Sequence, residues 1–380
     1  MKAVCDLLNF PTIADFHGCR IETFDRLAYF PRGSHWTLSD FLLQGQFGFD
    51  HRMAIATSAA GVDRLYRERD RNYMRMVGDF IDRFRDFDLI VMSNNFIHPE
   101  LLVHELKRPI KILGFFDDPH STYMRGIQYL WAFDGAFYIS PSYNERSLFH
   151  EALEKWGCAN HTWWPNVPVA YDRPDMSERF FAQRDLDVIY VGNPCRTKVD
   201  RLIRLKKHFG SRFRVHGRWP FKGYFGFVRG LMGKRVYPYR VTSLTTAKRT
   251  QLYWRTKIGF NMHTSEMPME TGNMRMYEVP AHGAMQLCDK AARDGHAQIF
   301  APDTEAVYYD SVEDAIEKIE YYLIHDKERL AIARAGCERF WADYEWEANL
   351  LRFLRWAVSV RGDTHVTQDG HVMARGSSAR

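Results

Sequence analysis

Short apolar runs alternate with amphipathic stretches through the first half of the chain. The runs have the length of buried strands, and turn-forming or polar residues follow them. The expected strands lie at 3–8, 53–57, 86–92, 110–116 and 132–140, and the expected helices at 61–85, 99–106 and 143–156. Strands that alternate with helices at this spacing predict a parallel sheet with helices on its faces.

A second alternation begins after Pro165, Pro168 and Pro174, which punctuate the chain as a domain linker does. Ser311 followed by Asp314 resembles a capping box at a helix start. The expected strands lie at 187–192, 213–216, 257–263, 284–288 and 306–309, and the expected helices at 198–209, 274–282, from 312 onward and at 347–358. The pattern predicts two doubly wound α/β domains facing a cleft, with ligands at the carboxyl ends of the strands.

Composition excludes several classes of protein. The 380 residues are 46% hydrophobic and 26% charged, which rules out a disordered or collagen-like chain. No apolar run approaches the ~20 residues of a membrane span, and Asp6 interrupts any secretory core near the N-terminus. Six scattered cysteines without C-x-x-C spacing fit free thiols in a reducing compartment, with Cys195 and Cys288 as small packing residues. A cytoplasmic protein is expected.

The densest group of polar residues lies at 270–283. Thr271, Gly272 and Asn273 form a loop before a helix, so their backbone N–H groups can face an anion. Glu278 on that helix offers two acceptor oxygens that suit a diol such as ribose. Glu270 supplies a second carboxylate. A capped amphipathic helix with solvated acids would show the same pattern.

A second candidate lies between an expected strand and helix at 191–198. Gly192 ends the strand, and Arg196 and Lys198 begin the helix, where they could clamp a diphosphate. A turn that is basic for no functional reason is the alternative. A P-loop is excluded, because G-x-x-x-x-G-K-[ST] is absent, as is G-x-G-x-x-G. The chain also lacks a G-x-S-x-G elbow, so no hydrolase nucleophile is indicated.

The third candidate follows the strand at 110–116. Asp117 and Asp118 lie beside His120, and such a group can supply a general base or hold an acceptor hydroxyl. An Asp-Pro turn that caps the next helix, with an exposed histidine, would look the same. As a metal site the cluster is weak, since no further ligand group accompanies it.

The net charge of +5 conceals a local excess of basic residues. Residues 217–265 carry ten Lys and Arg side chains and no acid, with aromatic residues interleaved in the first part. A membrane surface, a polyanion or a nucleic acid could meet such a surface. The wall of a cleft that binds a phosphorylated ligand is preferred over nucleic acid.

The motifs of the second half resemble the nucleotide-binding domain of GT-B glycosyltransferases. The matching segments are D-V-I-Y-V-G at 187–192 with Lys198, F-R-V-H-G at 213–217, K-I-G-F-N-M-H at 257–263 and N-M-R-M-Y-E-V-P-A-H-G at 273–283. Within that fold the chain is most similar to the CgeB-like (spore-maturation-protein-like) group-one glycosyltransferases, which also share the F-D-D-P segment. The resemblance covers about 88–353, whereas residues 1–60 match no motif.

The resemblance implies a division of the chain and a role for each motif. It places an acceptor-side domain at 1–166, a nucleotide-sugar domain at 167–345, a helix that crosses back to the first domain at 346–361 and a disordered tail at 362–380. Glu278 would bind the ribose and Glu270 the donor sugar, as the two acids of an E-x7-E pair. The remaining donor-binding residues would be Gly192, Arg196, Lys198, His216, Gly217, Thr271, Gly272, Asn273 and Arg275, of which Arg196 and Lys198 neutralise the leaving phosphate.

The expected activity is sugar transfer from a UDP-, GDP- or dTDP-sugar to a glycan, a lipid-linked sugar or a protein, as in polysaccharide biosynthesis. Arginine, lysine and a helix N-terminus would stabilise the leaving diphosphate without a metal. Asp118 or His120 would be the base if the enzyme inverts, and stereochemistry and oligomeric state are open. Segment 217–240 could contact the inner face of an anionic membrane. The alternatives are a nucleic-acid-associated protein, including a DNA-base glycosyltransferase, and a nucleotide-sugar epimerase.

Overall fold

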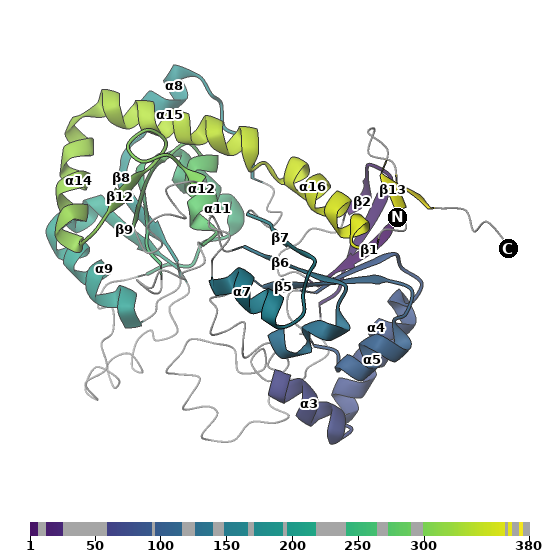
Figure 1. Cartoon of the computed structure of the whole chain (residues 1–380). Coiled ribbons are helices and arrows are strands. Elements are labelled where there is room, and N and C mark those ends of the chain that lie inside the picture. The colour runs from purple at the N-terminus through teal and green to yellow at the C-terminus, as the bar shows by residue number, and fades with distance from the viewer. Residues whose placement is uncertain are drawn as a thin grey trace, which may run out of the picture. The chain divides into compact units, whose positions relative to one another are not determined.

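The computed structural model describes residues 1–6, 13–25, 59–92, 96–115, 126–139, 148–165, 171–192, 196–217, 241–263, 273–289, 299–361, 364–366 and 372–374. The chain divides into two units (Figure 1). One unit comprises 1–169 and 346–380, and the other comprises 170–345. The chain thus enters the second unit between Pro168 and Pro174 and returns to the first at Trp346.

The first unit is built on a seven-stranded sheet of order β2-β3-β1-β4-β5-β6-β7. Its strands are β1 (Lys2–Cys5), β2 (Ile13–Phe16), β3 (Cys19–Thr23), β4 (Leu89–Met92), β5 (Ile110–Phe115), β6 (Gly135–Tyr138) and β7 (His161–Trp163). β2 and β3 pair antiparallel across a two-residue turn at His17 and Gly18, both of which have positive φ. All other neighbouring strands are parallel, so the parallel sheet that the sequence predicts is confirmed.

Helices cover both faces of this sheet, because alternate strand residues point to opposite sides. They are α3 (Ala59–Arg67), α4 (Arg71–Phe84), α5 (Pro99–Glu105), the 3₁₀ helix η2 (Ile127–Ala132), α7 (Leu148–Lys155) and α16 (Trp346–Ser359). Ile90 packs with α4 in one core. On the other face Leu89 packs with Leu350 and Phe353 of α16. The single helix expected at 61–85 is wrong, because Asp70 ends one helix and caps the next by accepting from the Tyr73 N–H.

The second unit contains a five-stranded, wholly parallel sheet of order β12-β11-β10-β8-β9. Its strands are β8 (Leu186–Val191), β9 (Phe213–His216), β10 (Thr256–Asn261), β11 (Met285–Asp289) and β12 (Val307–Tyr309). Its helices are α8 (Glu178–Ala182), α9 (Arg196–Phe209), the 3₁₀ helix η3 (Gly210–Arg212), α11 (Thr246–Trp254), α12 (Arg275–Ala281), α14 (Val312–Ile324) and α15 (Asp326–Asp343). As predicted, the Ser311 hydroxyl caps α14 by accepting from the Asp314 N–H.

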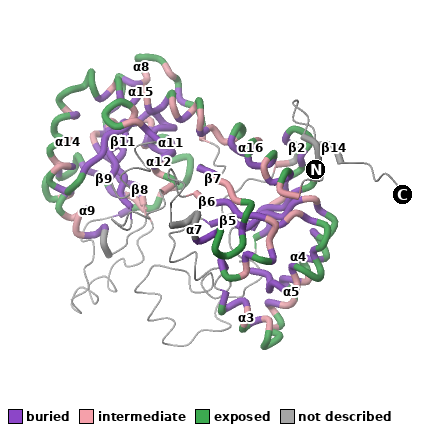
Figure 2. Tube along the Cα trace, viewed as in Figure 1, coloured by how far each residue is buried: buried purple, intermediate pink, exposed green. Residues whose placement is uncertain are grey.

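The strands of the second sheet are buried on both faces (Figure 2). Tyr190 packs in a core that contains side chains of α9 and α14, whereas Ile189 faces a smaller core with Val279 of α12. Gly259 on β10 lets α12 approach closely, since a Cβ there would collide with the Val279 side chain. This contact sets the distance between α12 and the sheet, and therefore the positions of the polar side chains on that helix.

Two expectations concern parts of the chain with little described structure. The strand expected at 53–57 lies outside the described residues. In the tail, β13 (Thr364–Val366) pairs antiparallel with β14 (Val372–Ala374). No helix in the described ranges is long and apolar enough to span a bilayer.

Candidate functional site

The second sheet has a topological switch point between β8 and β10. From β8 the chain runs first to β9 on one side and then to β10 on the other, as the strand order shows. Ligands of open parallel sheets bind outside the carboxyl ends of the strands at such a point. Gly192 directly follows β8 and Asn261 ends β10, so these residues mark the candidate site.

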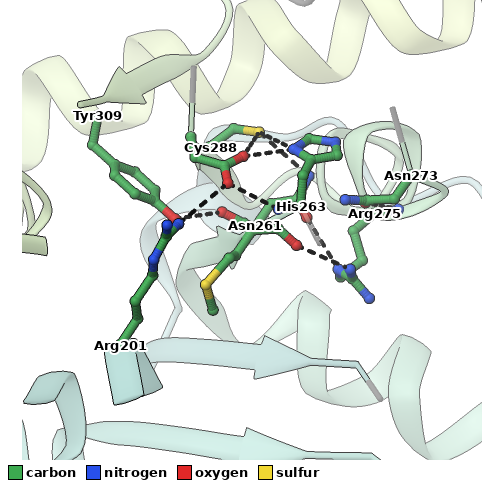
Figure 3. A network of polar contacts seen from close by, with 9 residues as sticks. Arg201, Asn261, His263, Asn273, Arg275, Cys288 and Tyr309 are labelled. Carbon is green, nitrogen blue, oxygen red and sulfur yellow. Dashed lines mark hydrogen bonds and ion pairs between the residues drawn. The ribbon is translucent and has the colours of Figure 1, made fainter. Parts of the chain in front are cut away.

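Arg275 clamps the two strand ends together. Its Nη1 donates to the Val191 carbonyl at 3.0 Å, its Nε to Asn261 Oδ1 at 3.0 Å and its Nη2 to the Met262 carbonyl at 3.3 Å (Figure 3). The guanidinium also lies 5.4 Å from the centroid of the Tyr190 ring. Three bonds to two neighbouring strands hold the first turn of α12 at the switch point.

Gly192 leaves the space that this clamp occupies. A Cβ at this position would lie 2.6 Å from Arg275 Nη1 and 2.7 Å from the Tyr190 hydroxyl. Neither group has room to retreat, because Arg275 is fixed by three hydrogen bonds and Tyr190 is fully buried. The glycine at the end of β8 is therefore required by the arginine clamp.

Asn273 and Lys198 lie on the segments that flank the switch point. Asn273 Oδ1 accepts from the Arg275 backbone N–H at 3.0 Å, while its Nδ2 has no hydrogen-bond partner within the described ranges. Lys198 is buried in the first turn of α9, an unusual place for an ammonium group. Arg196 begins α9, and its side chain lies outside the description.

Glu278 is a buried carboxylate on α12. Its Oε1 lies 2.6 Å from Nε of Arg249, and its side chain is only 7% exposed. Burial raises the pKa of Glu278 above its ordinary value, while the charges of Arg249 and Arg275 and a hydrogen bond from Tyr253 oppose that rise. Arg249 on α11 is not among the residues that the sequence singles out for the site.

His282 caps the same helix from inside the core. Its Nδ1 lies 2.7 Å from the Glu278 carbonyl oxygen and therefore carries the proton. The imidazole stacks on Tyr253, with centroids 5.4 Å apart. Burial lowers the pKa of His282 to about 4, so the ring is neutral at physiological pH.

The predicted donor residues His216 and Gly217 lie at the end of β9, the edge strand beside β8. Nδ1 of His216 is 2.9 Å from the Thr242 hydroxyl, and the Gly217 N–H donates to the Thr242 carbonyl at 3.1 Å. Burial lowers the pKa of His216 below its ordinary value. These contacts attach the end of β9 to the segment that leads into α11.

A second polar network lies at the ends of β10 and β11. Asp289 accepts from the His263 backbone N–H at 2.9 Å, and its other oxygen is 2.5 Å from His263 Nδ1 (Figure 3). Arg201 of α9 approaches the same carboxylate at 4.0 Å. Cys288 accepts a hydrogen bond from Asn261 Nδ2 at 3.4 Å, which joins this network to the arginine clamp.

His263, Cys288 and Asp289 have the chemistry of metal ligands, and their ligand atoms lie within 4.8 Å of one another. In this arrangement, however, His263 Nδ1 faces a carboxylate oxygen directly. Asp289 is thereby bonded by a backbone N–H and an imidazole, with a guanidinium nearby. The geometry is that of a hydrogen-bonded carboxylate–histidine pair.

The remaining predicted site residues lie outside the described residues. They are Asp117, Asp118, His120, Glu270, Thr271 and Gly272. The roles expected for them stay predictions. Arg249, Asn261, His263 and Asp289 were missed, although the rule that ligands meet the carboxyl ends of strands would have drawn attention to the last three.

The comparisons with known proteins match this unit of the structure. The sequence model of the family described as "Glycosyl transferase-like" matches residues 196–355. This segment is glycosyltransferase-like. It begins at α9 and contains the clamp, Glu278 and the carboxylate–histidine pair. A search among curated protein sequences gave no match.

Solved structures show the fold of the whole chain. Sucrose-phosphate synthase from Thermosynechococcus elongatus superposes with a TM-score of 0.54 at 12% identity, over 95% of this chain and 88% of that one. HepE from Anabaena in complex with UDP and glucose gives 0.52 at 13%, over 75% and 82%. S. aureus TarM in complex with UDP, fondaparinux and alpha-GlcNAc-glycerol gives 0.50 at 12%, over 71% and 55%, so this chain spans about half the length of TarM. The predicted two-domain GT-B fold is thus confirmed, whereas the CgeB-like subgroup stays a prediction.

Proposed function

We propose that this protein is a glycosyltransferase that moves a sugar from a nucleotide-sugar donor to a hydroxyl group of an acceptor. The observation that carries the proposal is the buried carboxylate of Glu278 on the helix that Arg275 clamps to the β8–β10 switch point. This is where a parallel sheet binds nucleotides. The same residues lie in the glycosyltransferase-like segment, and HepE of the same fold was crystallised with UDP-glucose.

The side chains of the site would divide the work between nucleoside and diphosphate. An ionised carboxylate accepts hydrogen bonds from both hydroxyls of a ribose, which is the role proposed for Glu278. Lys198 in the first turn of α9, with Arg196 one residue pair before it, would supply positive charge to the departing diphosphate. Charge that develops on a leaving group is stabilised strongly by fixed cations in a site that excludes water. Transfer would then proceed without a metal.

The acceptor is proposed to be a glycan, a lipid-linked sugar or a protein. TarM, which shares the fold, was crystallised with alpha-GlcNAc-glycerol and the polysaccharide fondaparinux, which favours a glycan. Asp118 and His120 follow β5 at the carboxyl edge of the first sheet and remain the proposed base for an inverting reaction. The basic segment 218–240 lies outside the described residues, so nucleic-acid or membrane contact stays a prediction.

Ligand-dependent thermal unfolding tests the proposal. UDP, GDP, dTDP, ADP, CMP and their sugars would be added to the full chain, and the true donor at 100 times its Kd should stabilise the native state by about 2.7 kcal/mol. That corresponds to a rise in Tm of roughly 5–10 °C for a domain of this size. Hydrolysis or transfer of the stabilising sugar nucleotide, followed with and without acceptor, separates transfer from epimerisation. A chain that no nucleotide stabilises would contradict the proposal.

Replacing Glu278 tests the site itself. Glu278→Gln removes the negative charge that two ribose hydroxyls require, and we expect UDP affinity by calorimetry to fall by about tenfold or more, the effect of one charged hydrogen bond. Glu317→Gln on the exposed face of α14 makes the same chemical change away from the switch point and should leave affinity unchanged. Equal affinities in the two variants would refute the assignment of Glu278.

A further inference from the structure

Arg249 occupies a position where a cation is unfavourable for its own helix. Thr245 caps α11 by accepting from the Lys248 N–H, so Lys248 and Arg249 both lie in or next to the first turn. That turn contains no acidic residue. The positive end of the helix dipole disfavours cations there, and Arg249 therefore needs a partner elsewhere.

The partner is Glu278 on the neighbouring helix. Nε of Arg249 lies 2.6 Å from Glu278 Oε1, and the arginine side chain is 32% exposed while that of the glutamate is 7% exposed. Arg249 thus reaches from the surface into the core and brings a charge to a carboxylate that has little access to water. Arg275, Tyr253 and Tyr171 face the same carboxylate from other elements.

Without a cation the buried carboxyl group would favour its neutral form. Burial acts to raise the pKa of Glu278, and Arg249 is the largest opposing influence. A neutral carboxyl group carries its own O–H and no longer accepts hydrogen bonds at both oxygens. The state of Glu278 that can receive two hydroxyls therefore depends on Arg249.

The ion pair leaves room for a ligand. An ionised carboxylate has about four lone-pair positions. Arg249 takes one of them on Oε1, and the hydrogen bond from Tyr253 takes another. Two positions remain, which is the number that the cis-diol of a ribose needs.

We propose that Arg249 is a positioning residue for nucleoside recognition: it keeps Glu278 ionised and fixes its carboxylate so that both ribose hydroxyls can donate to it. The inference rests on the proposed function and adds a residue that neither the sequence motifs nor the fold assigns. A purely structural role, in which the pair only joins α11 to α12, makes different predictions for pH and for the sugar of the ligand.

The test compares binding of UDP and 2′-deoxy-UDP by calorimetry for the wild type, Arg249→Ala, Arg249→Lys and Glu278→Gln. Without the arginine charge, Glu278 protonates near neutral pH, so Arg249→Ala should bind UDP about tenfold more weakly, and affinity should recover as pH rises to about 9. Arg249→Lys retains a charge and should restore most of the affinity. Glu278→Gln should be weak at every pH. The deficit of Arg249→Ala should be smaller for 2′-deoxy-UDP, which has one hydroxyl fewer to donate.

The outcomes separate the two proposals. If the wild type binds neither UDP nor another nucleoside diphosphate, the proposed function fails and the inference with it. If the wild type binds UDP and Glu278→Gln does not, but Arg249→Ala follows the wild-type pH profile, only the inference is overturned. Equal losses for UDP and 2′-deoxy-UDP at every pH would likewise show a structural role. Circular dichroism of Arg249→Ala and Arg249→Lys confirms that both variants are folded when affinity is measured.

Discussion

Replacing Gly192 by alanine should release the arginine clamp. The new Cβ would lie 2.6 Å from Arg275 Nη1 and 2.7 Å from the Tyr190 hydroxyl, both well inside van der Waals contact. Tyr190 is fully buried and cannot swing away, so the guanidinium has to move. Its movement breaks the bond from Nη1 to the Val191 carbonyl, the contact that ties α12 to β8.

The expected loss follows from the bonds that the clamp makes. A hydrogen bond from a charged group contributes about 1.5–3 kcal/mol, so losing the Val191 contact should reduce the free energy of unfolding by about that amount. If Arg275 also leaves Asn261 and Met262, the loss approaches the upper end of the range for a disrupted buried network. Because Glu278 lies one turn along the same helix, UDP affinity should fall as well.

Urea unfolding and calorimetric titration of the full chain measure the two effects, and Gly78→Ala is the control. Gly78 lies within α4, and a Cβ there meets nothing within 4 Å. The control should raise stability by about 0.5–1 kcal/mol, since alanine is the better helix former. A Gly192→Ala protein with wild-type stability and wild-type UDP affinity would refute the reasoning, because the alanine would then fit beside an undisturbed Arg275.

Three further changes test other parts of the second unit. Asp289→Asn weakens the bonds to the His263 backbone and imidazole and should lower the free energy of unfolding by about 1.5–3 kcal/mol, measured by urea unfolding. Gly336→Ala places a Cβ against the Glu305 carbonyl oxygen where α15 packs, and overpacking of this kind should cost about 1–3 kcal/mol of stability in the same assay. His282 has a folded-state pKa of about 4, below its ordinary value of 6.5, so the unfolded chain binds more protons between these values. Stability should therefore fall as pH decreases through this window, by up to about 3 kcal/mol, and a His282→Gln variant should lack that part of the dependence.

The elements that the sequence predicts well are those whose burial follows a simple period. Strands at 110–116 and 187–192 are continuous apolar runs, and they form β5 and β8 within one residue. α15 was missed for the opposite reason. Its buried stripe consists of Arg329, Ile332, Ala333, Gly336, Cys337 and Phe340, which has helical spacing but contains a charge and small residues. Hydrophobic periodicity is faint in such a helix even though the spacing is regular.

Single residues decided other differences. Asp70 breaks the helix expected at 61–85 because its side chain accepts from the Tyr73 N–H and so caps a new helix. His17 and Gly18 make a tight turn between β2 and β3, in a region where apolar residues alone indicate no clear element. Such local hydrogen bonds and backbone angles carry little weight in a pattern read over ten or more residues.

The candidate site was predictable where a motif fixes a backbone position and unpredictable where distant elements meet. Gly192 and Arg275 are both visible in the sequence, but that the glycine exists to admit the arginine follows only from their contact across 83 residues. Arg249 stands among ten basic residues that look alike in sequence. Its distinction is that α11 packs beside α12 and brings its Nε to Glu278. A basic segment read from sequence as a diffuse surface for an anion thus contains at least one arginine whose anion is a glutamate of the same chain, and the charge left to meet an external phosphate is correspondingly smaller.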